Sequence, residues 1–323
     1  VGNLSDFAGA SDPLIILDGI QFDGNLNTIS QNDIESFTVL KDAASTSLYG
    51  SRAANGVVII TTKKGIKGKK TQVNYSSQFS TISRAYDTYE TTNAQQYYGL
   101  MWEAYKNSLA ALGSTPDPEA EASATIFNRL GYNPFNVAND DIVRTDGTVN
   151  PDARVVTPST NWFDEIERQG SRQSHDLSVS GGTENSTIFL SAGYLKEKGY
   201  IVESDFERIS TRSRADFDVN DWLTLGGNMY VSLTEDSAPT SPISGAITNV
   251  FGWARDVAPI YPVYLVDPST SQFVLDANGN RLFDRGEGNV DLGLGARPFR
   301  PGRHALEEQI LNDINDRENA FGI

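Results

Sequence analysis

One stretch of the sequence has residue types and a spacing that could bind calcium. Residues 276–287 place oxygen ligands at the first, third, fifth, ninth and twelfth positions of such a loop, namely Asp276, Asn278, Asn280, Asp284 and Glu287. A calcium loop requires glycine at its sixth position, where this chain has Arg281, and it requires flanking helices that the sequence does not indicate. The segment 273–283 is more typical of a β-hairpin. We therefore expect no bound metal here.

The remaining side chains form no pattern suited to catalysis. The two histidines, His175 and His304, are far apart in sequence, and neither lies in a cluster of ligand residues. Cysteine is absent, which excludes disulfides and thiol chemistry but leaves the compartment open. The sequence contains neither a nucleophile elbow nor a phosphate-binding loop. It therefore predicts a protein that is not an enzyme and has no cofactor.

Composition excludes two further classes of protein. The formal net charge of −16 would repel phosphate backbones, so nucleic acid is not an expected partner. Hydrophobic residues make up 38% of the chain, and no apolar run exceeds the four residues of 57–60. A membrane-spanning helix needs about 20 such residues. A membrane β-barrel stays possible, because its strands place apolar residues only at every second position.

The first 65 residues predict a small α+β unit. A strand over 14–17 ends in the turn Asp18-Gly19, and a second strand covers 37–41. Asp42 stands at an N-cap position before a short helix over 43–49, which Gly50 ends. A buried strand follows over 56–64, with 57–60 in the centre of the unit. Next comes a lysine-rich segment, 63–70, which is expected to be a solvated linker or else a contact with a membrane surface.

After this linker the hydrophobic period changes to two. The alternating segments are 71–81, 174–180, 187–195, 208–219 and 222–234. In 174–180 the apolar face carries Leu177 and Val179. In the other four segments the apolar positions expected to face outward include Val73, Tyr75, Phe79, Ile188, Leu190, Tyr194, Ile209, Phe217, Val219, Leu223, Leu225, Met229 and Val231. Most run about ten residues or more, whereas soluble strands average about five or six and transmembrane strands need about 9–11. The pattern favours a membrane barrel, with a soluble β-sandwich as the alternative.

Loop lengths add an independent argument for the barrel. About 90 residues separate the first and second strands, and about 70 follow the fifth, whereas 181–186 and 220–221 are tight turns. Outer-membrane barrels alternate in this way, with short periplasmic turns and long extracellular loops. The segments 84–172 and 235–303 should therefore lie together at the end opposite the lysine-rich linker. A sandwich gives no reason for such sorting.

The polar faces of these strands are charged, as the inside of a filled barrel can be. They carry Arg208, Arg212, Arg214, Asp216 and Asp218. On the other side, aromatic residues near the strand ends could join the aromatic girdles of a barrel or pack as ordinary sheet residues: Tyr75, Phe79, Tyr194, Phe217 and Trp222.

The long loops are expected to contain a helix and aromatic segments of their own. Residues 92–112 read as a helix that begins with a capping box of Thr92 and Gln95. Its apolar stripe, expected to pack on the same protein, comprises Tyr97, Leu100, Met101, Tyr105, Leu109 and Leu112. The aromatic and proline residues of 251–264 are expected to be available for contact with a partner.

The segment 39–65, "VLKDAASTSLYGSRAANGVVIITTKKG", resembles the plug signature of TonB-dependent outer-membrane receptors. Lys41-Asp42 and "YGSRAANG" (49–56) are similar to the SusC/RagA-like branch, with Ala53 where that family often has glycine. "PLIILDGI" (13–20) resembles the upstream plug strand, and 160–201 and 205–228 resemble early barrel strands. The resemblance covers most of the chain.

This resemblance implies a set of plug residues with structural or coupling roles. They are Asp18, Gly19, Lys41, Asp42, Tyr49, Gly50, Arg52, Asn55 and Gly56. Tyr49 is expected to pack while Gly50 turns the chain, and Asn55-Gly56 permits a tight entry into the next strand. Arg52 is expected to pair with acidic residues of the barrel lumen.

The expected fold is mainly β, part of an antiparallel outer-membrane β-barrel with a small α+β plug inside. The expected division is 1–65 for the C-terminal part of the plug, 66–70 for the linker, and 71–323 for the first strands and long extracellular loops. Five strands and a possible sixth after 304–319 cannot close a barrel of about 22 strands. The early plug would therefore precede Val1, which is not a start methionine, and most of the barrel would follow Ile323.

The function that the resemblance implies is TonB-dependent import of an oligosaccharide or a peptide across the cell outer membrane. The implied partners are a SusD-like surface lipoprotein, the TonB complex and outer-membrane lipid. The alternative is a non-transporting surface β-sandwich that binds glycans or mediates adhesion. Substrate identity does not follow from the sequence.

Overall fold

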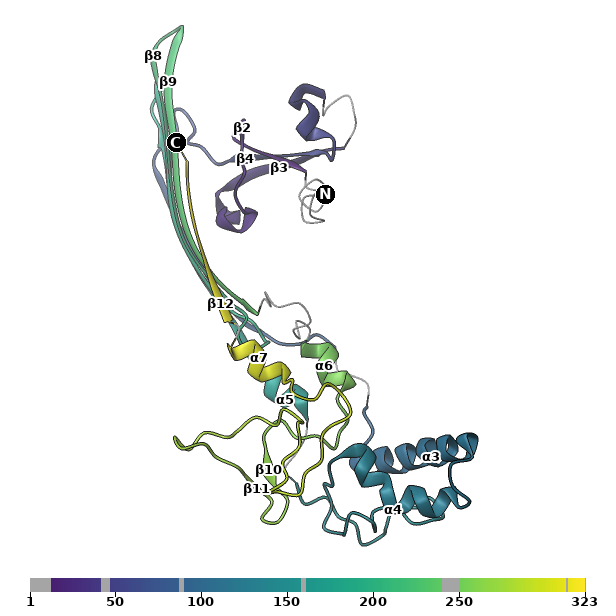
Figure 1. Ribbon diagram of the computed structural model, residues 1–323. Helices are drawn as coiled ribbons and strands as arrows, with labels where there is room; N and C mark the ends of the chain where they lie inside the picture. The colour runs from purple at the N-terminus through teal and green to yellow at the C-terminus, as the bar shows by residue number, and fades with distance from the viewer. Residues whose placement is uncertain are drawn as a thin grey trace.

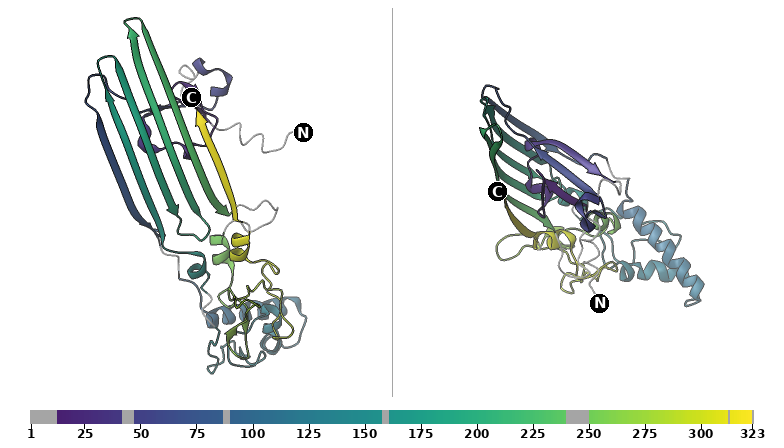
Figure 2. Two further views of the ribbon diagram at one scale, coloured as in Figure 1. Left: turned by 90° about the vertical axis from the view of Figure 1, so that its left-hand side faces the viewer. Right: turned by 90° about the horizontal axis from the view of Figure 1, so that it is seen from above.

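The chain folds into a small sheet, a long curved sheet and a helical body at one end of it (Figure 1). The computed structural model describes residues 13–41, 47–86, 90–157, 161–239, 250–311 and 313–322. The small sheet lies on the concave side of the long one (Figure 1) and behind it when the convex face is viewed (Figure 2, left). This is the arrangement of a plug against a barrel wall, and the two parts are named plug and wall below.

The plug is a four-stranded sheet in the order β2-β1-β4-β3. Its strands are β1 (Leu14–Leu17), β2 (Ile20–Gln21), β3 (Ile34–Leu40) and β4 (Val57–Thr62). β4 pairs in parallel with β1 and antiparallel with β3. The expected central position of 57–60 is confirmed, and Val57 and Ile60 are almost fully buried.

Short 3₁₀ helices connect the plug strands. They are η2 (Leu26–Thr28), η3 (Gln31–Asp33), η4 (Ser47–Tyr49) and η5 (Ser51–Ala53). The helix expected over 43–49 is described only at its end, where it is 3₁₀. Asp42 and residues 43–46 lie outside the described residues.

The wall is one antiparallel sheet in the order β12-β9-β8-β7-β6-β5. Its strands are β5 (Gln72–Ile82), β6 (Gly170–Gly182), β7 (Ser186–Lys198), β8 (Asp205–Asn220), β9 (Leu223–Pro239) and β12 (Asp313–Gly322). The strands of 13 to 17 residues exceed the expected segments, because pairing continues into polar ends. The sixth strand begins at Asp313, inside the stretch that was expected to precede it.

The two faces of the wall are those that the period of two predicts. Val73, Phe79, Phe217 and Leu225 are exposed on the convex side, while Arg212 is buried against the plug. Phe189, which breaks the alternation of its segment, is 3% exposed and shares the inward parity of Thr187. The expected outward positions are thus confirmed.

The two long loops fold together into a compact outer body. It contains α3 (Ala94–Leu112), α4 (Pro118–Leu130), α5 (Trp162–Ile166), α6 (Val250–Asp256) and α7 (Ala305–Leu311), with the small hairpin of β10 (Val266–Asp267) and β11 (Gln272–Phe273). One hydrophobic core runs through residues of both loops. Trp162 Nε1 donates to the carbonyl of Tyr261 at 3.1 Å, and the Tyr261 hydroxyl donates to the carbonyl of Leu130 at 2.7 Å.

This core corrects the expectation for 251–264. Trp253, Ile260, Tyr261 and Val263 are at most 3% exposed, so they hold the outer body together and are not available to a partner. His304 is also buried here, and its Nε2 lies 2.7 Å from the carbonyl oxygen of Val263.

Helix α3 differs from the prediction in its cap and its buried face. The capping box is formed by Asn93 and Gln96, one residue later than expected. Four residues of the expected stripe pack against the core of the outer body, namely Tyr97, Met101, Tyr105 and Leu109, whereas Leu100 and Leu112 are exposed. Tyr98 and Trp102 are buried instead, because α4 packs on that side: Trp102 Nε1 donates to Ser123 Oγ at 2.9 Å.

The stretch with calcium-like spacing is a hairpin turn, as expected. Leu275 pairs with Arg281, and the Asp276 carboxylate accepts from the backbone amides of Asn278 and Asn280, each at 2.8 Å. Across the described residues, no group of three or more histidine, aspartate or glutamate side chains is placed to hold a metal ion.

The long loops and the tight turns lie at opposite ends of the wall. All described helices of the outer body gather at one end, and the β8–β9 turn is at the other (Figure 2). Gly68 of the linker donates from its amide to the carbonyl of Thr183 in the β6–β7 turn at 2.9 Å. The expected sorting of loops is therefore confirmed. Within the described parts, no helix combines the length and apolar composition needed to cross a membrane.

Candidate functional site

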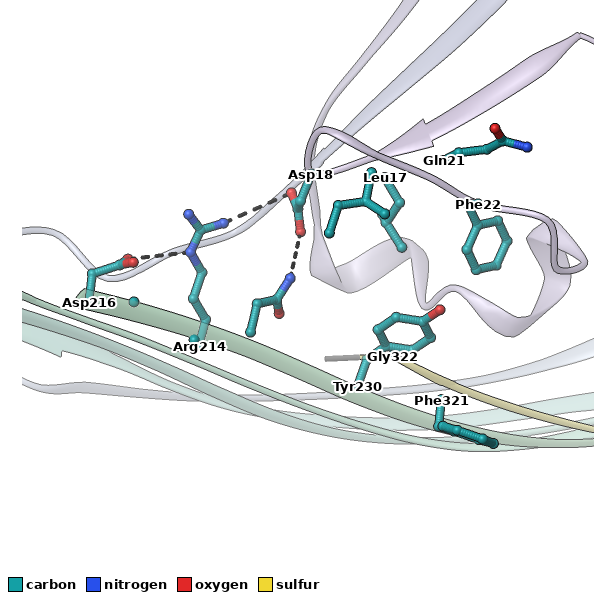
Figure 3. A pocket seen from close by; sticks show the side chains of 13 residues that line it. Leu17, Asp18, Gln21, Phe22, Arg214, Asp216, Tyr230, Phe321 and Gly322 are labelled. Atoms are coloured by element: carbon teal, nitrogen blue, oxygen red, sulfur yellow. Dashed lines mark hydrogen bonds and ion pairs between the residues drawn. The ribbon is translucent and has the colours of Figure 1, made fainter. Parts of the chain in front are cut away.

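The plug meets the wall at the turn between β1 and β2. Asp18 and Gly19 both have positive φ, 51° and 91°, and Leu17 pairs with Ile20 across the turn. An Asp-Gly pair suits such a turn, because glycine has no Cβ to clash and aspartate tolerates the left-handed conformation. The tight turn lifts the Asp18 carboxylate out of the plug towards β8 and β9 (Figure 3).

Asp18 is bound from the plug and from the wall at once, and we name this set of contacts the Asp18 latch. Within the plug its carboxylate accepts from the Thr62 amide at 2.8 Å and from the Thr62 hydroxyl at 2.6 Å. From the wall, Arg212 donates to the same carboxylate, as does Asn228 Nδ2 at 3.1 Å. Arg214 adds an ion pair at 4.0 Å. The latch therefore joins β1, β4, β8 and β9.

The latch is shielded from water, so its charges interact strongly. The side chains of Asp18 and Arg212 are 10% and 3% exposed. Burial by itself raises the pKa of Asp18, but the Thr62 hydrogen bonds and the charges of Arg212 and Arg214 outweigh it and hold that pKa below its usual value. The carboxylate is therefore ionised at neutral pH.

The pKa of a second plug carboxylate near the wall is shifted in the opposite direction. Asp33 ends η3 and is 8% exposed. Burial raises its pKa, and the nearby Arg212 and Lys63 lower it only in part. Arg212 therefore interacts with two plug acids, of which Asp18 is the one that hydrogen-bonds to it.

Further contacts hold η2 and its flanks against the wall. Arg208 Nη1 donates to the carbonyls of Asn27 at 2.7 Å and Ile29 at 3.0 Å. The Asn25 amide donates to Glu318 of β12 at 3.2 Å. The rings of Phe22 and Tyr230 lie 6.3 Å apart. The contact is therefore mostly polar.

A cavity of about 460 Å³ lies beside the latch, between the β1–β2 hairpin and strands β8, β9 and β12 (Figure 3). Its lining mixes charge and apolar surface: Asp18, Gln21, Phe22, Arg214, Asp216 and Tyr230.

The linker is fixed to the turn end of the wall. Lys67 forms an ion pair with Asp218 of β8, and the Gly182 amide donates to the Lys69 carbonyl at 3.0 Å. A Cβ at Gly65 would collide with the backbone of Gly181 and Ile188. The C-terminal exit of the plug is thus attached independently of the latch.

The other residues of the expected plug signature lie away from the latch. Lys41 is exposed at the end of β3, and Tyr49 packs on a core that includes Ile16 and Val57. Gly50 and Gly56 have φ of 72° and 100°, which favours glycine at both positions. Asn55 lies in the turn before Gly56, and Asp42 is outside the described residues.

The expected pairing of Arg52 with acidic residues of the barrel lumen stays a prediction. Arg52 Nη1 donates to Gln21 of β2 at 3.0 Å, on an exposed surface within the plug. The charge pairing across the contact has the reverse sign: the plug supplies the acid Asp18, and the wall supplies Arg212 and Arg214. The surplus of arginines on the inward face of β8 was the signal for a plug acid.

Sequence reasoning also missed Thr62 and Asn228. Both are uncharged residues in strands, and each reaches Asp18 only through tertiary pairing over 44 and 210 residues. The charged groups of the site pair with one another across separate elements. Such an arrangement suits reversible attachment of two parts rather than bond making.

Comparisons with known proteins agree with this geometry. Residues 3–57 match the family model of the TonB-dependent receptor plug domain. The TonB-dependent receptor SusC of Bacteroides thetaiotaomicron is 28% identical over 98% of this chain, and receptor P39 of Formosa agariphila is 32% identical over 71%. These alignments cover 28% and 18% of the two relatives, so the chain spans under a third of their length.

Solved structures show the same fold. A RagAB peptide transporter structure aligns with a TM-score of 0.51 and 25% identity over 70% of this chain and 24% of its own. A RagAB peptide importer in a "closed-closed" state aligns with a TM-score of 0.54 and 22% identity over 84% of this chain and 30% of its own. The chain belongs to the SusC/RagA-like TonB-dependent receptors.

Proposed function

We propose that this chain forms part of an outer-membrane importer that moves a bulky nutrient, an oligosaccharide or a peptide, with energy from TonB. The proposal rests on the contrast between the two faces of the wall. The concave face is polar and holds the plug through the Asp18 latch, whereas the convex face exposes apolar side chains such as Phe79, Phe217 and Leu225. A plug that is attached by ion pairs can be released without covalent chemistry.

The soluble sandwich alternative fits this arrangement less well. A sandwich buries the apolar faces of two sheets against each other. Here the apolar face of the wall is exposed, and the buried contact is the charged one. Apolar exposure on this scale suits a lipid environment.

The division into plug (1–65), linker (66–70) and barrel segments with extracellular loops (71–323) is part of this proposal. The lysine-rich linker and the tight turns would face the periplasm, and the outer body would face the medium. Its position supports a role as the seat of a SusD-like surface lipoprotein, while TonB would act from the periplasmic side.

Two substrate classes are proposed, peptides and oligosaccharides. The RagAB neighbours are named for peptide transport, which supports the peptide arm for this chain. The oligosaccharide arm rests on the resemblance of residues 39–65 to the SusC/RagA-like branch.

Uptake by cells that carry the full-length receptor tests the proposal. Fluorescent oligosaccharide and peptide mixtures are supplied to cells with the receptor, to cells without it, and to receptor cells that lack TonB. We expect accumulation of one class only when receptor and TonB are both present. Uptake that persists without TonB, or a full-length receptor that stays soluble without detergent, would overturn the proposal.

Protease added to intact cells tests the orientation. Cleavage is expected within 84–172 or 235–303, and the turn at 181–186 should be spared. Because a bound lipoprotein could shield the loops, the same digestion is repeated in cells that lack it. Cleavage confined to 181–186 and 220–221 would invert the proposed topology.

A further inference from the structure

The convex face of the wall has a long stretch without charge. On β8 the outward positions from Ile209 to Val219 are Ile, Thr, Ser, Ala, Phe and Val. On β9 those from Leu223 to Leu233 are Leu, Leu, Gly, Met, Val and Leu. Most of the large side chains among them are exposed, including Phe217 at 56% and Leu225 at 58%.

The length of this stretch matches the apolar thickness of an outer membrane. Ten residue steps at about 3.4 Å each make about 34 Å along a strand. Strands of membrane barrels tilt by about 35–45°, which leaves a height of about 24–28 Å against an apolar band of about 25 Å. β9 has the same span as β8, because Ile209 pairs with Leu233 and both strands end at the β8–β9 turn.

At one end this stretch gives way to charge on four neighbouring strands at once. The first charged outward residues are Lys196 on β7, Glu207 on β8, Glu235 on β9 and Arg317 on β12. The strand register places them side by side, Lys196 with Glu207, Glu207 with Glu235, and Glu235 with Arg317. Lys196 forms an ion pair with Glu207 at 2.9 Å, and Arg317 forms one with Glu235 at 3.1 Å. We name these four residues the charged row.

Next to the charged row, β5, β6 and β7 carry an aromatic cluster around His175. The Tyr75 hydroxyl lies 2.7 Å from His175 Nδ1, and Gln173 Nε2 lies 2.9 Å from its Nε2. The rings of Tyr75 and Tyr194 are nearly parallel to the imidazole, at 6.2 and 6.4 Å, and Phe79 meets it edge-on at 5.4 Å. A neutral imidazole satisfies both hydrogen bonds, donating from Nδ1 and accepting at Nε2.

We infer that the outer-leaflet boundary of the membrane crosses β7, β8 and β9 between the charged row and the residues one register step below it, Tyr194, Ile209 and Leu233. Acyl chains would cover the apolar stretch, and lipid headgroups would meet the charged row. The His175 cluster would sit at the interface, where amphipathic aromatic side chains gather. This inference rests on the proposed function, because it requires a barrel in the outer membrane.

The competing occupant of this face is a second copy of the receptor. The span argument favours lipid, because the outward positions of both strands stay uncharged over about one membrane thickness. The charged row is also satisfied by its own ion pairs, so it does not need partner charges.

Four nitroxide labels along β7 test the inference in the full-length receptor, in a cysteine-free background and in outer-membrane vesicles. Ser186, Leu190, Tyr194 and Lys198 are spaced by four residues and point the same way. We expect oxygen accessibility to be highest at Leu190. Accessibility to a water-soluble nickel chelate should rise several-fold from Leu190 to Lys198, and it should also rise at Ser186.

Two results would overturn the inference: a nickel accessibility at Leu190 equal to that at Lys198, or exclusion of both reagents with spin–spin broadening, which would reveal a second copy. Uptake is measured on the same variants. The expected depth profile without uptake would reject the importer and leave the boundary standing. A flat profile with intact uptake would reject the boundary alone.

Discussion

Replacing Asp18 with asparagine isolates the charge of the latch. Asparagine tolerates the positive φ of 51° as well as aspartate does, so the turn is preserved. The amide can still accept from Arg212, but it can no longer balance a guanidinium that is only 3% exposed. Removing one partner of a buried ion pair costs about 3–5 kcal/mol. Because some hydrogen bonding survives and Asp33 still faces Arg212, we expect the lower end, about 3 kcal/mol.

This cost should appear as a more frequent opening of the plug. About 3 kcal/mol corresponds to a little over 100-fold in an equilibrium constant. Hydrogen exchange of the full-length receptor reports it directly, because amides of β1 and β4 should exchange about 100-fold faster while those of β8 and β9 change little. The matched control is Asp23→Asn, an exposed plug aspartate that hydrogen-bonds to Gln21 at 2.6 Å.

The double change Asp18→Asn with Arg212→Gln completes the test. If the two side chains act as a pair, removing both should cost less than the sum of the single costs. Additive effects, or unchanged protection of β1 in Asp18→Asn, would refute the latch.

The direction in which pH changes the strength of the latch follows from the pKa of Asp18. The pKa of Asp18 is lower in the folded protein than in the unfolded chain. The stability that Asp18 contributes is therefore fully present above its unfolded pKa, and it is lost as pH falls through its folded pKa.

Three other predictions concern the outer body and the convex face. Burial lowers the pKa of His304 to about 4. The outer body should therefore lose up to about 3 kcal/mol of stability as pH falls from about 6.5 to 4, because the unfolded chain takes up the proton first. Proteolysis should become faster over this range, and a rate that does not change with pH would contradict the prediction. Leu190→Arg should lower barrel stability in lipid by about 2–4 kcal/mol and Tyr194→Arg by about 0–1 kcal/mol, measured by denaturant unfolding; equal costs would place both at one depth. Gly131→Ala should lower the stability of the outer body by about 1–3 kcal/mol more than Gly113→Ala does, measured as the hydrogen-exchange protection of the loop amides. Both glycines have positive φ, but only at Gly131 would a Cβ collide, with the carbonyl of Ala296; equal costs would count against this packing.

The strands and their faces could be predicted from the sequence because a period of two assigns every residue of a strand to one side. Their lengths could not, since β8 begins at Asp205 and β9 continues to Pro239, where the apolar alternation has stopped but backbone pairing has not. The helix start was one residue off, because Thr92 and Asn93 are both good caps.

The latch and the outer core depended on information that local patterns do not contain. Asp18 and Arg212 are 194 residues apart, and nothing near Asp18 indicates which charge it meets. Trp253 and Tyr261 are amphipathic residues in a loop, and such residues suit either a partner surface or a core. Their burial follows from the meeting of two loops that the chain keeps far apart.

The interlocked outer body also constrains the order of assembly. The hydrogen bond between Tyr261 and Leu130 closes a stretch of 131 residues, and four strands of the wall, β6 to β9, lie within it. Residues 94–166 cannot complete their core when they are made, because Trp253 and Ile260 arrive later. Contacts of such high sequence separation form slowly and leave apolar surface uncovered meanwhile. The core of the first loop therefore stays incomplete until the second loop reaches it.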